Sequence, residues 1–424
     1  MLSFPFERHV LDNGLTVILA PDPAVPVVAL NLWYGVGSRN ERPGRTGFAH
    51  LFEHMMFQGS AHVPKNRHFE LVEGAGGSLN ATTWFDRTNY FETLPSHHLD
   101  LALWLESDRM GWLLPAMTQE KLDNQRDVVR NERRERYDNQ PYGDWDERLQ
   151  RLVFPADHPY HHTVIGSMED LAAADLDDVA EFFQVYYAPN NAVLTLTGDI
   201  EPAPTLAKVR EYFGDIPRGG VVPPVPGRLD PGERIGETVR ETVRARVPLP
   251  RVYLASRVPP FTTDDFYAAD VATSVLSDGR ASRLYRRLVR EQGVAKDVVS
   301  YAFPLATGRS FMISWITGYP ESDPSELEAA LTAELEALAD VSDAEVQRAL
   351  ALAETRFLRQ VAQLATRADQ FSMYQQLMGD AGRLNSEMDR LRTVTPERVR
   401  SFAERYLGAD NQAVLTYLPD QEAS

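Results

Sequence analysis

The segment His50-Leu51-Phe52-Glu53-His54 carries side chains that could bind a metal ion and act beside it. On a helix, residues four apart share one face, so His50 and His54 can contact a single ion while Glu53 lies alongside. Two histidines that hold zinc, with a carboxylate next to a water on that ion, are typical of zinc hydrolases. The competing interpretation is a helix whose histidines are capped or packed. That interpretation suits a lone histidine, whereas the pair with its glutamate favours metal binding.

The residues around this motif predict a buried helix. Gly44, Thr46 and Gly47 supply turn and cap residues before it, apolar side chains surround it on most sides, and Gly59 ends it. Buried polar groups cost free energy unless they are paired or bind a metal. Two histidines and a glutamate in this setting therefore need a partner, and zinc is the simplest one.

Composition narrows the classes of function. The chain has 424 residues and no cysteine, which favours two domains and leaves histidine and carboxylate as zinc ligands. A formal net charge of -18 argues against nucleic acid and anionic membranes as partners. The N-terminus has neither the basic region nor the apolar region of a signal peptide, and no segment is apolar enough to span a membrane. We expect a cytoplasmic protein, although a processed precursor would have the same sequence features.

The order of the predicted elements indicates an α+β fold. Runs of β-forming residues predict four strands in the first half of the chain, at 15–19, 27–33, 78–83 and 88–94. The helix with the histidines lies between the second and third of these strands. A long helix is expected from about Thr118 to Tyr137.

The chain also contains a linker and an internal repeat. Residues 216–232 are dense in Pro and Gly without a helical or strand period, which predicts a linker between domains at 1–215 and 233–424. The pattern of Val179 to Gly198 recurs as Val399 to Pro419, an offset of about 220 residues, which indicates duplication of one α+β unit. All ten histidines precede the linker. The second unit is therefore expected to lack the metal site and to have a structural role.

A zinc site with two histidines needs a third protein ligand and an open position for water. The helix predicted from Thr118 to Tyr137 offers four carboxylates: Asp123, Asp127, Glu132 and Glu135. Charged helix faces are usually solvated, so spacing alone leaves Glu132 and Glu135 as equal candidates. Adjacent histidines point to different sides of an element, so surface or supporting roles are expected for the others: His97, His98, His158, His161 and His162.

Several segments together resemble one family of enzymes. They are His50 to His54, Arg126 to Arg134, His158 to Tyr160, and Val164 to Gly166. They are similar to the pitrilysin/insulinase-type zinc metallopeptidases, called inverzincins after the reversed His-x-x-Glu-His motif. By length, the chain resembles the short two-domain branch that is similar to mitochondrial processing peptidase and its bacterial homologues.

The resemblance implies a fold and a set of roles. The fold is two homologous α/β-sandwich units, the duplicated pitrilysin/LuxS-like metallopeptidase fold, with the catalytic site in the first. His50, His54 and Glu132 would be the zinc ligands and Glu53 the general base, which decides for Glu132 over Glu135. The family usually has a carboxylate seven residues before the third ligand, where this chain has Gln125. An amide can hydrogen-bond a ligand but adds no charge, so we expect Gln125 to support the site in this weaker way.

The resemblance also implies how a peptide is held. The segment Gly76 to Thr82 is similar to the edge strand along which the family aligns an extended substrate, with Asn80 and Ala81 as binding residues. Main-chain hydrogen bonds to such a strand do not read side chains, so many unfolded peptides can bind. Spacing alone would suggest an ordinary strand that starts at a glycine.

A second substrate-binding element departs from the family pattern. Active members commonly carry an Arg and a Tyr in the second unit, and this chain has Arg290 but Lys296 where the Tyr would fall. In the branch built from two different chains, this pair and the histidine motif lie on separate subunits. We therefore expect a heterodimer with a homologous chain that carries the Arg/Tyr pair, with a homodimer as the alternative.

The function predicted from these observations is a zinc-dependent endopeptidase that cleaves unstructured peptides inside a chamber formed by two chains. Glu53 would take a proton from the attacking water while zinc polarises the peptide carbonyl. The first alternative is a non-catalytic scaffold or subunit of the same fold. The second is a zinc hydrolase that acts on something other than peptides.

Overall fold

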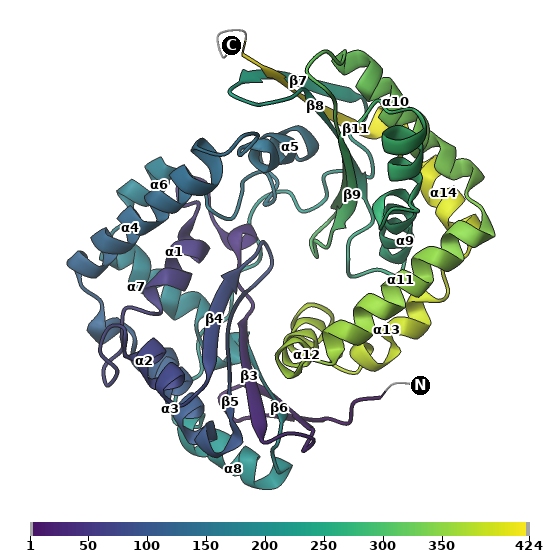
Figure 1. Ribbon diagram of the computed structural model, residues 1–424. Helices are drawn as coiled ribbons and strands as arrows, with labels where there is room; N and C mark the ends of the chain where they lie inside the picture. Colours follow the sequence, from purple (N-terminus) through teal and green to yellow (C-terminus); the bar gives the residue numbers. More distant parts are fainter. Residues whose placement is uncertain (1–2, 421–424) are drawn as a thin grey trace. The chain divides into compact units, whose positions relative to one another are not determined.

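The computed structural model describes residues 3–420 of the chain, which form two compact units (Figure 1). The first unit comprises Met1–Glu132, Val164–Pro226 and Arg359–Ser386, and the second comprises Arg133–Thr163, Gly227–Leu358 and Glu387–Ser424. Each unit therefore contains a segment from the other half of the sequence. The predicted division into a catalytic domain at 1–215, a linker at 216–232 and a second domain at 233–424 stays a prediction, and the compact units are discontinuous in the sequence.

The first unit is built on a six-stranded sheet in the order β1-β2-β6-β3-β5-β4. Its strands are β1 Glu7–Val10, β2 Thr16–Pro21, β3 Val27–Tyr34, β4 Ser78–Thr83, β5 Thr88–Pro95 and β6 Ala192–Gly198. β2 and β6 run parallel, and the other neighbours are antiparallel. The strand expected at 78–83 is confirmed with the same bounds, and it lies at the end of the sheet.

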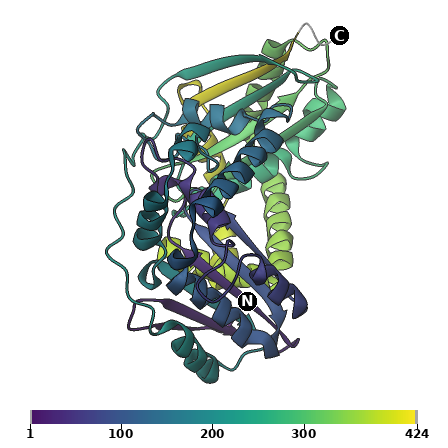
Figure 2. The same cartoon turned by 90° about the vertical axis from the view of Figure 1, so that its left-hand side faces the viewer.

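Helices cover both faces of this sheet. They are α1 Phe48–Met55, α2 Arg67–Gly74, α3 Leu99–Trp112, α4 Gln119–Arg133, α6 Met168–Ala173, α7 Leu176–Tyr186, α8 Pro202–Phe213 and α12 Leu364–Met378. Figures 1 and 2 show α12 on the face opposite to α1, α3 and α7, and it packs against β3 and β6. Because side chains alternate along a strand, each strand presents one set of residues to α12 and the other set to the remaining helices.

The long helix expected from about Thr118 to Tyr137 is α4, which continues as a π-helical turn, η4, over Arg134–Asp138. A second π-helical turn, η6, spans Tyr285–Glu291. Short 3-10 turns occur at η1 Ser38–Asn40, η2 Ser96–His98, η3 Leu114–Ala116, η5 Pro189–Asn191, η7 Ala337–Asp340 and η8 Ala409–Asn411.

The second unit has a five-stranded sheet in the order β7-β11-β8-β10-β9. Its strands are β7 Thr238–Ala245, β8 Arg251–Val258, β9 Asp297–Phe303, β10 Ser310–Thr317 and β11 Gln412–Pro419. Its helices are α5 Trp145–Val153, α9 Phe266–Ser277, α10 Pro324–Glu336, α11 Asp343–Val361, α13 Arg383–Leu391 and α14 Pro396–Tyr406, and the chain passes between the units within α11 and α13.

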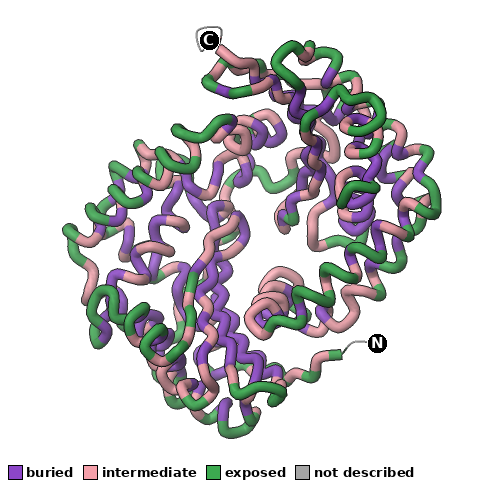
Figure 3. Tube along the Cα trace, viewed as in Figure 1, coloured by how far each residue is buried: buried purple, intermediate pink, exposed green. Residues whose placement is uncertain are grey.

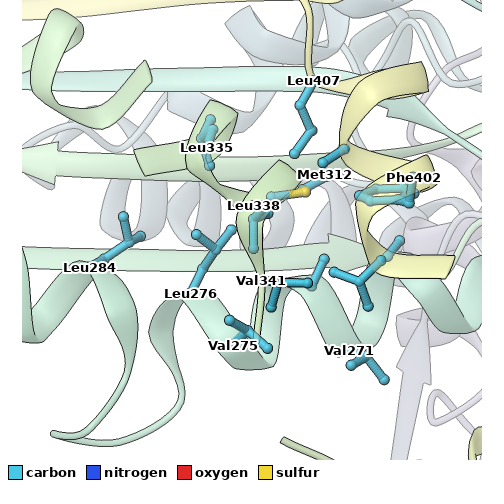
Figure 4. Packing of buried hydrophobic residues seen from close by; sticks show 14 of the residues in the cluster. Val271, Val275, Leu276, Leu284, Met312, Leu335, Leu338, Val341, Phe402 and Leu407 are labelled. Carbon is cyan, nitrogen blue, oxygen red and sulfur yellow. The ribbon is translucent and has the colours of Figure 1, made fainter. Parts of the chain in front are cut away.

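Most strand residues of both sheets are buried, as Figure 3 shows along the Cα trace. In the second unit, α9, α10 and α14 enclose an apolar core with one face of the sheet (Figure 4). This core includes Val271, Val275, Leu276, Leu284, Met312, Leu335, Leu338, Val341, Phe402 and Leu407. The aliphatic and aromatic side chains of this core fill the space between the helices and the strands.

The two units repeat one topology. The order β2-β6-β3-β5-β4 in the first matches β7-β11-β8-β10-β9 in the second, and each has one parallel pair, β2 with β6 and β7 with β11. The exchanged segments also correspond, because α12 packs on β3 and β6 while α5 packs on β8 and β11. The predicted α+β class with a duplicated unit is confirmed. Within residues 3–420, no helix combines the length and the apolar character needed to cross a bilayer.

Candidate metal centre

Helix α1 carries the His-x-x-Glu-His motif, and the sequence around it explains why it forms there. Its apolar side chains are buried, which leaves one face for the motif. The helix starts after Gly47, whose φ of 86° favours glycine. The carboxylate of Glu41 accepts hydrogen bonds from the backbone N–H groups of Gly47 (2.9 Å) and Ala49 (2.8 Å). A negative group at this end satisfies unpaired donors and complements the helix dipole, so Glu41 fixes the start of α1.

Helix α4 brings a carboxylate to the two histidines. Glu132 lies in its last turn, with Oε2 3.5 Å from His50 Nε2 and 3.4 Å from His54 Nε2. Ligand atoms held about 2.1 Å from a tetrahedral zinc ion lie roughly 3.4 Å from one another. In residues 3–420, these three side chains form the one group of metal-ligating residues whose ligand atoms all lie within 4.8 Å of one another. The donor types and spacings therefore fit a zinc ion.

The environment of these side chains suits a catalytic metal. The exposed fractions of the side chains are 12% for His50, 25% for His54 and 16% for Glu132. The group is therefore half-buried rather than enclosed, which leaves room for a water or a substrate as a fourth ligand. The rings of His50 and His54 are perpendicular, with centroids 4.9 Å apart.

Glu53 lies beside this group and has one clear partner. Thr83, the last residue of β4, donates a hydrogen bond from Oγ1 to Glu53 Oε2 at 2.6 Å. Burial raises the pKa of Glu53, and the charge of Glu132 adds to this rise, whereas Thr83, His54 and Arg87 act in the opposite direction. A carboxylate with a raised pKa accepts a proton more readily, as a general base must.

Two further predicted residues lie on β4, the edge strand next to α1. Asn80 and Ala81 pair with Phe91 and Tyr90 of β5, and β4 is the last strand on this side of the sheet. Asn80 is exposed and Ala81 is buried. Since α1 packs on β4, a peptide added to this edge would run beside the histidines.

Comparison with known proteins supplies the family. A family model described as "Insulinase (Peptidase family M16)" matches residues 16–153, and one described as "Peptidase M16 inactive domain" matches residues 173–352. Together they cover most of the chain. The chain belongs to the insulinase (M16) peptidase family. The predicted resemblance is therefore confirmed at the level of the family.

Three relatives show how far the match extends. The zinc protease PqqE of Helicobacter pylori is 30% identical over 346 residues, which cover 81% of this chain and 77% of that protein. An uncharacterized zinc protease of Streptomyces coelicolor is 25% identical over 431 residues and covers 99% of this chain and 91% of that protein. The crystal structure of a protease from Helicobacter pylori matches with a TM-score of 0.92 and 26% identity, covering 98% of this chain and 100% of that one. The whole two-unit fold is thus shared with that crystal structure.

The structure places the other predicted residues of this M16 family member as follows. Gln125 is buried on α4, two turns before Glu132, and donates a hydrogen bond to Asn124 Oδ1 at 2.8 Å. Arg290 is exposed in η6 of the second unit, whereas the histidine motif belongs to the first. Lys296 directly precedes β9, and its backbone N–H donates to the carbonyl of Thr317 (2.8 Å). The roles of Gln125 and Arg290 stay predictions.

The remaining candidate histidines have local partners. His158 is buried, its Nδ1 accepts from the backbone N–H of Tyr160 (3.1 Å), and burial lowers its pKa to about 4. His161 Nδ1 lies 2.8 Å from the carbonyl of Phe154, and the rings of His97 and His98 pack together with centroids 4.2 Å apart. The surface or supporting roles expected for these histidines stay predictions, and His158 itself is buried in the second unit.

Two residues of the site were not predicted from the sequence. Glu41 precedes α1 by several residues and carries no capping motif, so only the folded loop shows that it caps the helix. Thr83 could have been found from strand alternation, since it shares a face of β4 with Ala81. Its contact with Glu53 nevertheless depends on how α1 packs against the sheet.

Proposed function

We propose that this M16 family member is a zinc-dependent endopeptidase that cleaves unstructured peptides. One observation carries the proposal: His50, His54 and Glu132 offer three ligand atoms at the spacing of a tetrahedral zinc site, with the carboxylate of Glu53 beside them. The zinc proteases named among its relatives support the same reading.

The roles of the side chains follow from their chemistry. His50 and His54 would hold zinc through Nε2 and Glu132 through a carboxylate oxygen, and bound zinc would polarise a peptide carbonyl and lower the pKa of water. Glu53 then takes the proton of the attacking water and returns it to the leaving amine nitrogen. Thr83 holds one oxygen of Glu53, which leaves the other oxygen to move the proton.

Substrate binding would use the edge of the first sheet. An extended peptide adds to β4 by main-chain hydrogen bonds, with Asn80 and Ala81 next to its backbone. A folded protein cannot present such a strand, so the preferred substrates are unstructured. Arg290, which the family resemblance predicts to bind substrate, belongs to the second unit, and this role stays a prediction.

The active form would include a second, homologous chain. Lys296 stands where the family commonly has a Tyr, so we propose that a partner supplies the Arg/Tyr pair and that the two chains enclose the substrate. Co-purification from the native source, followed by a peptide assay with and without the partner, tests this. A fully active single chain would contradict it, and a homodimer would show as self-association. The cytoplasmic location stays a prediction.

The test of the proposed function combines metal content with activity. Purified protein is analysed for bound zinc and then assayed on an unstructured peptide and on a folded protein, with and without a chelator. We expect about one zinc per chain and chelator-sensitive cleavage of the peptide alone. Protein without stoichiometric zinc would support the non-catalytic scaffold. Stoichiometric zinc without peptide cleavage, also in the presence of the partner, would support a zinc hydrolase with another substrate.

A further inference from the structure

Arg87 lies in the turn between β4 and β5 and fastens the end of the edge strand. Its Nη1 donates to the carbonyl of Thr82 (2.8 Å), to Thr82 Oγ1 (2.5 Å) and to Asn89 Oδ1 (3.1 Å). Its guanidinium also lies over the ring of Trp33, 5.4 Å from the ring centroid. Thr82 Oγ1 in turn donates to Asn89 Oδ1 at 2.6 Å. One cation thus holds both the backbone and the side chain of Thr82.

Helix α12 brings a carboxylate to the same cluster from a distant part of the sequence. Asp369 Oδ1 accepts from Trp33 Nε1 (2.8 Å), Asn89 Nδ2 (3.1 Å) and Asn31 Nδ2 (3.4 Å). These donors stand on β3 and β5, on the face of the first sheet that α12 covers. Burial raises the pKa of Asp369, and the positive charge of Arg87 opposes this rise. The carboxylate is therefore the common acceptor that orders the side chains around Arg87.

The opposite face of β4 carries the contact with the catalytic base. Thr82 and Thr83 are consecutive, so their side chains leave the strand on opposite faces. Thr83 donates to Glu53 at 2.6 Å. Because the two residues share a backbone, fixing Thr82 fixes the position from which Thr83 reaches Glu53. Hydrogen bonds connect Asp369 with Asn89, Asn89 with Arg87, and Arg87 with Thr82, and the peptide bond after Thr82 leads to Thr83.

We propose that Asp369 is a positioning residue for peptide hydrolysis: it anchors the end of β4 and so keeps the Thr83 hydroxyl on Glu53. The inference rests on the proposed function. It means that α12, which the second half of the chain contributes to the first unit, is part of the machinery that orients the base. A purely structural role for Asp369 would affect stability without affecting the base.

A second contact of α12 provides the matched control. Two residues before Asp369, Arg367 Nη2 pairs with Asp22 Oδ2 at 2.5 Å, at the end of β2. In the strand order of the first sheet, β4 is the last strand at one end and β2 is the second strand from the other end. The substitution Asp22→Asn therefore weakens the docking of α12 without touching the cluster at Thr82.

The test is a double-mutant cycle between Asp369→Ala and Thr83→Val in the full-length protein, with zinc content, kcat and KM measured on an unstructured peptide. We expect Thr83→Val to lower kcat about 10- to 100-fold, since it removes a hydrogen bond to a charged group. Asp369→Ala should lower kcat about tenfold, with zinc content and KM nearly unchanged. If Asp369 acts through Thr83, the double variant will be no slower than Thr83→Val alone.

Conservative variants separate positioning from folding. Thr83→Ser keeps a hydroxyl and Asp369→Asn keeps an acceptor oxygen, so both should recover most of kcat. Asp22→Asn should lower the melting temperature as much as Asp369→Asn while kcat stays within about twofold of the starting protein. The proposal would be overturned if the loss of kcat in the double variant equalled the product of the losses in Asp369→Ala and Thr83→Val. It would also be overturned if Asp22→Asn lost as much kcat as Asp369→Ala.

A measurement that does not depend on activity separates the failure of the proposed peptidase function from the failure of the anchoring role of Asp369. Hydrogen exchange of the amides in residues 78–83 should be about fivefold faster in Asp369→Ala and unchanged in Asp22→Asn. If β4 loosens in this way but the zinc-loaded parent protein cleaves no peptide, the proposed function is wrong and the anchoring role stands. If the parent is active while β4 exchange is unchanged in Asp369→Ala, the anchoring role is wrong.

Discussion

The exchanged helices α12 and α5 meet two chemically different sheet faces. In the first unit, Asp369 of α12 accepts hydrogen bonds from Trp33 and Asn89 on the strands beneath it. In the second unit, Trp145 of α5 stacks on Tyr253 of β8, with ring centroids 5.7 Å apart and planes 6° apart. The same position in one topology therefore has polar contacts in the first unit, whereas in the second an aromatic stack accompanies the ion pair between Arg148 of α5 and Glu241 of β7.

The difference matches what each unit has to hold in place. Hydrogen bonds weaken steeply when distance or angle changes, so a polar network fixes its members closely. Aromatic pairs tolerate both offset stacking and edge-to-face contacts, so they stabilise a face without fixing single atoms. The unit that carries the metal-ligating group has the stricter face. The second unit, for which a structural role is expected, has the more tolerant one.

The helices on the other faces show the same contrast. The residues 220 positions after His50, Glu53 and His54 are Asp270, Thr273 and Ser274 of α9. Thr273 Oγ1 donates to the carbonyl of Asp270 within its own helix (2.9 Å). The residue 220 positions after Glu132 is Leu352, which is exposed. Metal binding in this chain is thus expected of the first unit alone.

The largest effect is expected from Glu53→Gln. The amide cannot take a proton, so kcat should fall about 1,000-fold or more while the zinc content is kept. The matched change in the second unit, Thr273→Val, removes only a bond within α9 and should leave kcat within about twofold. Peptide assays and zinc analysis of both variants provide the measurement. Near-normal hydrolysis by Glu53→Gln would show that another group is the base and would break the contrast between α1 and α9.

Trp145→Ala tests whether the aromatic face only stabilises. Removal of the indole should lower the free energy of unfolding by about 3 kcal/mol, because the ring stacks on Tyr253 and packs near Trp315. Trp145→Phe keeps an aromatic contact and should cost less. Urea unfolding measures both changes, and kcat of the folded protein should stay near that of the parent. A tenfold loss of kcat would mean that the aromatic face also serves catalysis.

A shared weakness to acid should appear in both units. His68 in the first and His158 in the second are almost fully buried, and burial lowers the pKa of each from 6.5 to about 4. The unfolded chain then binds a proton that the folded chain does not between pH 6.5 and 4. Stability present above pH 6.5 is therefore lost as the pH falls towards 4, by about 3 kcal/mol per histidine. NMR titration of the ring protons is the direct measurement, and ordinary values near 6.5 would contradict the prediction.

Local patterns in the sequence predicted the helix and strand that carry the site. The spacing of His50 and His54 is a property of a single helix, and the β-forming run from Ser78 to Thr83 is bounded by turn residues, so both could be found without tertiary information. Spacing alone did not decide whether Glu132 or Glu135 is the third metal ligand. The choice depends on which carboxylate faces α1, and this is set by the way α4 packs against α1. The family resemblance chose Glu132, and the structure brings its carboxylate to both histidines.

Contacts between distant segments could not be predicted in this way. Asn89 and Asp369 are 280 residues apart in the sequence, and no local period indicates that α12 docks on the first sheet. The sequence does not show, for the same reason, that each unit contains a segment from the other half of the chain. An amphipathic helix shows that it needs a partner but not which sheet provides it.

The smallest effect is expected from an ion pair that occurs in both units. The basic and the acidic residue of this pair have exchanged positions between the two repeats. Arg45 Nε lies 3.0 Å from Asp178 Oδ1, and 220 residues later Asp265 Oδ1 lies 3.9 Å from Arg398 Nη2. Each pair lines a pocket beside α7 or α14, so the repeats preserve attraction rather than residue identity. Arg45→Asp places like charges together and should cost about 1 kcal/mol at low salt, and adding Asp178→Arg should restore most of it. Urea unfolding at low and high salt tests this, and equal stability of the single and double variants would show that the pair contributes nothing.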